Sequence, residues 1–74
     1  MKMKETRKLP SERNNPTVER RVLAAAHTHF HKRKGIRAVF EHGHWWIVLD
    51  SGKIYDVVDA EGYGSINGFG FEGV

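Results

Sequence analysis

The chain has 74 residues, no cysteine and a net charge of +3, which limits it to one small domain without disulfides or thiolate metal sites. A cysteine-free composition is typical of reducing compartments, so we expect a cytoplasmic protein. No apolar run approaches the ~20 residues of a membrane-spanning helix, and we expect no contact with a membrane.

The charge of the chain changes sign along its length. Residues 1–34 hold ten Lys and Arg against three acids, a net charge of +7, whereas residues 35–74 hold two against six, a net charge of −4. This polarity predicts a module with two unlike surfaces that face two unlike partners.

Residues 1–14 are charged and show no hydrophobic period. They predict a flexible basic arm ahead of a single domain over residues 15–74. Such an arm either contacts phosphates or simply keeps the terminus solvated.

A helix is predicted over residues 16–33. Asn15 suits the N-cap position, and Pro16 suits the first helical position, where a missing N–H group has no cost. Residues 32–34 are basic, as favoured at a helix C-terminus, and Gly35 is a natural residue just beyond such an end. One side of the helix carries an apolar stripe at three- and four-residue steps, formed by Val18, Val22, Ala25, Ala26, His29 and Phe30.

Three strands are predicted over residues 36–41, 44–50 and 53–58, joined by two-residue turns at His42-Gly43 and Ser51-Gly52. The predicted fold is therefore α+β, with one N-terminal helix packed on a three-stranded antiparallel meander. This register pairs Val48 with Tyr55. The face under the helix then collects Ile36, Ala38, Phe40, Trp45, Ile47, Leu49, Ile54 and Val58.

The opposite face of the predicted sheet exposes an apolar patch, which is the candidate protein-binding surface. Trp and Tyr side chains are enriched at binding hot spots. Three occupants of the patch remain open: the C-terminal tail, a second copy of the chain in a homodimer, or a different partner. The patch consists of Trp46, Val48, Tyr55 and Val57, with Val39 beside them.

The tail, residues 59–74, is rich in glycine. Its alternating Phe69-Gly70-Phe71 segment predicts either a short edge strand or a loop pinned by two aromatic rings. A phosphate-binding glycine loop is not predicted, because no helix follows the run and no Lys lies within it.

The histidines and carboxylates are candidates for a metal or acid–base site. His27 and His31 are four residues apart on the predicted helix, and His42 and His44 flank a turn, but neither pair has the Cys or Glu spacing of a zinc motif. We therefore predict no metal and no cofactor.

A group of carboxylates, Asp56, Asp59 and Glu61, ends the third predicted strand. The register places Asp56 on the face under the helix, opposite Ile47, which is an anomaly for a carboxylate. Because nothing else in the chain supplies a substrate pocket, we expect a protein that is not an enzyme.

Two hypotheses for a non-catalytic binding module follow. The second hypothesis, the alternative to the one given next, is a small regulator or inhibitor, of the type that phages and mobile elements encode, which binds a protein through the Trp46/Tyr55 face. The first is association with the nucleic-acid backbone through the basic arm and a basic helix face, formed by Arg20, Arg21, His27, His31, Lys32, Arg33 and Lys34.

Overall fold

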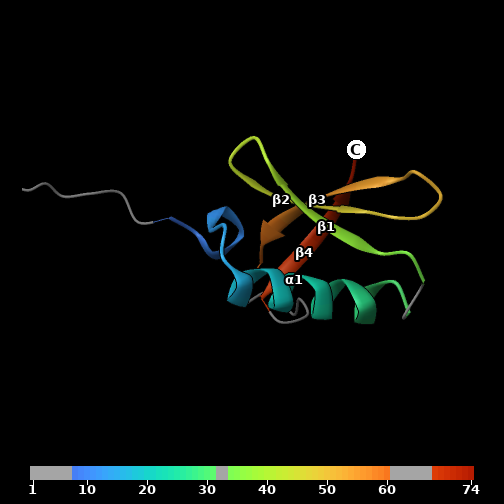
Figure 1. The fold of residues 1–74 in the computed structure, drawn as a ribbon, viewed down its shortest axis with the longest axis horizontal. Coiled ribbons are helices and arrows are strands. Elements are labelled where there is room, and N and C mark those ends of the chain that lie inside the picture. The colour runs from blue at the N-terminus through green and yellow to red at the C-terminus, as the bar shows by residue number, and fades with distance from the viewer. Residues whose placement is uncertain (1–7, 32–33, 61–67) are drawn as a thin grey trace, which may run out of the picture.

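The computed structural model describes residues 8–31, 34–60 and 68–74. Its four strands form one antiparallel sheet in the order β1-β2-β3-β4, and α1 lies against one face of that sheet (Figure 1). The α+β class is confirmed, but the sheet has four strands rather than three. In chain order the elements are η1 (Pro10–Glu12), α1 (Pro16–His29), β1 (Arg37–Glu41), β2 (His44–Val48), β3 (Ile54–Asp59) and β4 (Phe69–Gly73).

Helix α1 begins where the sequence predicts, and the cap has a direct physical cause. The Asn15 side chain accepts a hydrogen bond from the Val18 N–H at 2.9 Å, and Pro16 occupies the first turn. The predicted apolar stripe is buried at Val18, Val22, Ala25 and Ala26. With 14 residues α1 is too short for a bilayer, and no helix in the described part of the chain could span one.

The end of α1 differs from the prediction of residue 33. The helix ends at His29, where the Phe30 N–H donates to the Ala26 carbonyl and the His31 N–H donates to the Thr28 carbonyl. His31 then adopts a left-handed conformation, with φ of 58°, which terminates the helix in the way a glycine was expected to do four residues later. The Phe30 ring packs 4.8 Å from the Tyr55 ring, so contact with the sheet accompanies the early end.

The β1–β2 hairpin confirms the first predicted register. Phe40 pairs with Trp45, and Ala38 pairs with Ile47. His42 and Gly43 both have positive φ, 55° and 86°, as a two-residue type I′ turn requires.

The β2–β3 hairpin corrects the second predicted register by one residue. Its turn holds three residues, 50–52, and closes with a 2.9 Å hydrogen bond from the Leu49 N–H to the Lys53 carbonyl. Gly52 takes the left-handed position of this turn, with φ of 95°. As a result Val48 pairs with Ile54 instead of Tyr55.

A shift of one residue moves every side chain of β3 to the other face of the sheet. Val57, predicted to be exposed, is 1% exposed and belongs to the core, and Tyr55 packs against that core. The predicted core residues Ile54 and Val58 instead face away from α1, and Ile54 is 43% exposed. Asp56 leaves the helix side with them and lies on the opposite face, where its side chain is 33% exposed.

The described part of the tail forms the edge strand β4. Its register pairs Phe71 with Val57 and Phe69 with Asp59. The two aromatic rings therefore point toward α1, and Phe69 is 1% exposed. Residues 69–73 complete the sheet rather than covering its opposite face.

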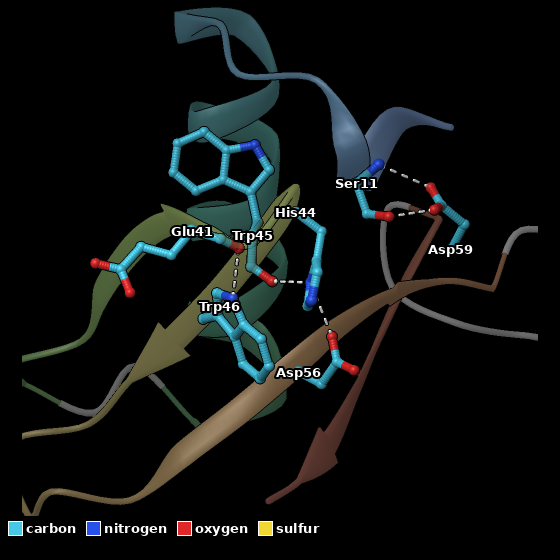
Figure 2. Close-up of polar contacts among 7 residues, drawn as sticks. All are labelled: Ser11, Glu41, His44, Trp45, Trp46, Asp56 and Asp59. Carbon is cyan, nitrogen blue, oxygen red and sulfur yellow. Dashed lines mark hydrogen bonds and ion pairs between the residues drawn. The ribbon is translucent and has the colours of Figure 1, made fainter. Parts of the chain in front are cut away.

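Part of the predicted arm is packed into the domain. Ser11 is buried, and its N–H donates to Asp59 Oδ1 at 3.0 Å while its hydroxyl donates to Asp59 Oδ2 (Figure 2). The Trp45 indole N–H donates to the Arg13 carbonyl at 2.8 Å. The folded domain thus begins before residue 15, and residues 1–7 lie outside the described part.

Replacement of Ser11 by Ala is expected to lower the free energy of unfolding by roughly 1–3 kcal/mol, because a carboxylate loses one of its two hydrogen bonds in a partly buried site. Urea unfolding measures the change. Ser51→Ala, at an exposed turn position, is the matched control, and equal stability of the two variants contradicts the role given to Ser11.

Replacement of Gly35 by Ala is expected to destabilise the protein more than Gly43→Ala. Both glycines have positive φ, which costs an L-residue about 1–2 kcal/mol. A Cβ at Gly35 lies 2.6 Å from the Asp50 Cβ, whereas a Cβ at Gly43 meets nothing within 4 Å. Thermal unfolding of the two variants side by side isolates the steric contribution, and equal melting temperatures contradict it.

Candidate functional site

The face of the sheet that points away from α1, called the outer face below, is the surface that no described element covers (Figure 1). Strand alternation and the observed pairings define it. Its residues are Arg37, Val39 and Glu41 of β1, His44, Trp46 and Val48 of β2, Ile54, Asp56 and Val58 of β3, and Gly70 and Glu72 of β4.

Trp46 lies at the centre of the outer face and is held in one orientation. Its indole N–H donates to the Glu41 carbonyl at 2.9 Å, which ties the indole of β2 to the end of β1 (Figure 2). The His44 ring packs on it at a centroid distance of 4.3 Å and an interplanar angle of 39°. The His42 ring meets it nearly perpendicularly, at 6.5 Å and 87°.

Trp45 and Trp46 are neighbours in sequence but project from opposite faces of β2 (Figure 2). Trp45 is 4% exposed and belongs to the core, whereas Trp46 is only partly buried. The two adjacent indoles therefore have different roles, one in folding and one at the surface.

His44 links Trp46 to Asp56 across β2 and β3. Its Nδ1 lies 3.0 Å from the Trp45 carbonyl oxygen and 3.1 Å from Asp56 Oδ1. Because both neighbours are acceptors, Nδ1 carries the proton. Among described residues Asp56 Oδ1 has no aligned hydrogen bond, so the carbonyl takes the N–H and the carboxylate is attracted to the ring electrostatically.

A hollow of about 290 Å³ lies beside Trp46 on the outer face. Its size is at the lower end of small-molecule pockets, which hold roughly 300–1,000 Å³, and it matches a side chain of a larger partner better than a whole ligand. Its lining comes from β1, β2, the turn between them, the start of β3 and the last residue of the chain: Val39, Glu41, His42, Trp46, Val48, Ile54 and Val74.

The outer face is acidic at its rim. Glu41, Asp56 and Glu72 contribute three carboxylates, and Arg37 contributes one cation. Glu41 and Glu72 are exposed, and the Asp56 side chain is 33% exposed. An apolar centre with an acidic rim disfavours phosphates and favours a cationic or apolar partner.

The structure separates the four residues predicted to bind protein. Trp46 and Val48 lie on the outer face, while Tyr55 and Val57 point toward α1 and are packed in or against the core. Sequence reasoning missed Ile54 and Asp56 on this surface. The signal that could have found them is the Asp-Ser-Gly turn, since glycine in third place is typical of a three-residue hairpin loop.

The residues predicted to bind nucleic acid are only partly brought together. Arg20 and His27 lie exposed on α1, and the Arg21 guanidinium sits 5.2 Å from the Phe69 ring centroid, at the edge of the core. His31 and Lys34 are exposed but lie beyond the helix end. Lys32 and Arg33 lie outside the described residues.

The metal and acid–base candidates do not converge. His31 has left the helix, so the four-residue spacing from His27 no longer aligns the two rings. Asp56 and Asp59 lie on opposite faces of β3, and Asp59 is bonded to Ser11, while Glu61 is outside the described residues. Across residues 8–31, 34–60 and 68–74, no three His, Asp or Glu side chains could hold a metal ion together.

Comparison of the chain with family models, with curated proteins and with solved structures finds no match.

The two tryptophans are expected to report different environments. Trp45→Phe leaves the emission of Trp46, which should lie at longer wavelength and be quenched strongly by acrylamide. Trp46→Phe leaves the emission of the 4% exposed Trp45, which should be blue-shifted and protected. Equal quenching of the two variants in steady-state fluorescence contradicts the assignment of Trp46 to an open face.

Proposed function

We propose that this protein is a non-catalytic binding module that recognises another protein through the outer face of its sheet. The observation that carries the proposal is the Trp46 indole, held in one orientation beside an apolar hollow on a face that no described element covers.

The contacts of Trp46 support this role energetically. A partner that packs on a mobile side chain must immobilise it, at about 0.5–1.5 kcal/mol for each rotamer-rich chain. The hydrogen bond to Glu41 and the His44 ring already restrict this indole. Its polar N–H is satisfied within the protein, so the remaining ring surface contacts a partner without leaving a donor unpaired.

The surroundings of Trp46 support a protein partner. Val39, Val48 and Ile54 form an apolar centre, and the polar side chains of Glu41 and His42 lie beside it. This arrangement of apolar core and polar rim is the usual anatomy of a protein–protein interface. As a small regulator or inhibitor, the protein would use this face to cover a basic or apolar surface of its partner.

Association with nucleic acid, the first hypothesis from the sequence, has less support. The three carboxylates of the outer face repel phosphates, and the exposed basic residues of α1 in the described part are two arginines and two histidines: Arg20, Arg21, His27 and His29. Backbone binding of nucleic acid depends on several cations acting together.

The candidate acid–base groups His44 and Asp59 contact other groups of the protein, which supports a module without catalysis. His44 Nδ1 lies against the Trp45 carbonyl, and Asp59 accepts two hydrogen bonds from Ser11. Both groups contribute to holding the fold together.

Trp46→Ala is expected to weaken partner capture at least roughly tenfold while leaving the far-UV circular dichroism unchanged, because the side chain projects away from the core. The measurement is affinity capture from native lysate by the tagged chain, quantified by mass spectrometry, with and without nuclease.

Two variants serve as controls for this experiment. Trp45→Ala should unfold the domain, at a cost of about 3–5 kcal/mol, since it removes a buried ring. The helix double variant Arg20→Ala with His27→Ala should capture the same proteins as the wild type. Capture that is lost in the helix variant and on nuclease treatment, but retained in Trp46→Ala, overturns the proposal in favour of nucleic acid.

A further inference from the structure

Strand β1 forms one free edge of the sheet, and within the described residues it pairs only with β2. The two-residue turn makes Glu41 and His44 a hydrogen-bonded pair, so residues 37, 39 and 41 direct their backbone groups to β2. Ala38 and Phe40 consequently direct their N–H and C=O groups outward, where they are available to another strand.

We propose that a second copy of this chain pairs with that edge, antiparallel about Val39, so that two sheets join into one of eight strands. The pairing sets Ala38 of each copy opposite Phe40 of the other. These are the two residues whose backbone groups face outward, so each such pair can exchange both hydrogen bonds. Val39 then lies opposite Val39 of the second copy, as a non-hydrogen-bonded pair.

The charges of the edge are self-complementary in this register. Arg37 and Glu41 lie two residues on either side of Val39 and point to the same face of the sheet. The two-fold pairing therefore sets each Arg37 opposite Glu41 of the other copy. Among described residues neither side chain has an ion-pair partner within one copy, so both are available for this contact.

The second copy also contributes a side chain to the candidate site. Glu41 lines the hollow beside Trp46, and the incoming Arg37 lies opposite Glu41 on the same face. The indole N–H is bonded to the Glu41 carbonyl, so the nitrogen of the ring contacts the strand that forms the joint. Both hollows then belong to one continuous outer face, with the Val39 pair between them.

The other free edge, β4, lacks this complementarity. Antiparallel self-pairing about Phe71 would set Glu72 opposite Gly70, without a cation on either side. Glycines also weaken a strand, because they bring no side chain to pack. The β1 edge is therefore the one that selects a second copy.

Sedimentation equilibrium tests the proposal on the full chain. The joint is short, so we expect a weak dimer that forms in the micromolar range or above. Arg37→Glu sets Glu opposite Glu41, and Glu41→Arg sets Arg opposite Arg37, so each variant alone should dimerise at least roughly tenfold more weakly. An equimolar mixture of the two should associate as the wild type does, because both cross pairs become opposite in charge. The double variant should recover dimerisation for the same reason.

Three further samples make the outcome decisive. Lys53→Glu changes the net charge by the same amount as Arg37→Glu, but at an exposed position away from the edge, and this variant should dimerise normally. Ala38→Pro removes an outward N–H from an edge strand and should abolish the dimer with the secondary structure intact. Trp46→Ala should retain the dimer, so loss of partner binding and loss of dimerisation can be told apart. A wild type that stays monomeric at about 1 mM, or a mixture that fails to associate, overturns the proposal.

Discussion

Gly52, in the left-handed region with φ of 95°, closes a three-residue turn between β2 and β3, and the rest of the structure depends on the register that this turn sets. Val48 pairs with Ile54, and so Tyr55 and Val57 lie under α1. The same alternation brings Asp59 to the helix side, where it accepts both hydrogen bonds of Ser11. A shift of one residue would bury Asp56 and leave Ser11 without its partner.

Successive side chains of β2 point to opposite faces of the sheet, so neighbouring residues of this strand serve the core and the outer face in turn. Trp45 enters the core, and its indole N–H anchors the N-terminal segment at the Arg13 carbonyl. The indole N–H of Trp46, one residue later, donates a hydrogen bond to the Glu41 carbonyl, and its ring lies on the outer face. In the described part of the chain α1 covers one side of the sheet, and no described element covers the other, which is the side that we propose for recognition.

The proposed recognition and the proposed dimer use the same strand in different ways. The side chains of Val39 and Glu41 line the hollow, while the backbone groups of Ala38 and Phe40 offer the edge. The fold also shows which charged residues of the acidic half lie on the outer face. Glu41 and Asp56, both from the acidic half, lie on the same face as Trp46, and Arg37, the one cation of that face among the described residues, stands where the proposed second copy would contact it.

By itself the sequence determined the start of α1, the first hairpin and the α+β class. Each rests on a local preference: Asn15 for the N-cap, Gly43 for the type I′ turn, and an apolar stripe with helical spacing. Only the tertiary structure decided which side of β3 is buried, because both sets of alternating residues are apolar: Ile54 and Val58 on one side, Tyr55 and Val57 on the other. Packing of β3 and β4 against α1 and the contact of Ser11 with Asp59 distinguish the two registers. These contacts join residues as far as 48 positions apart, which no local pattern encodes.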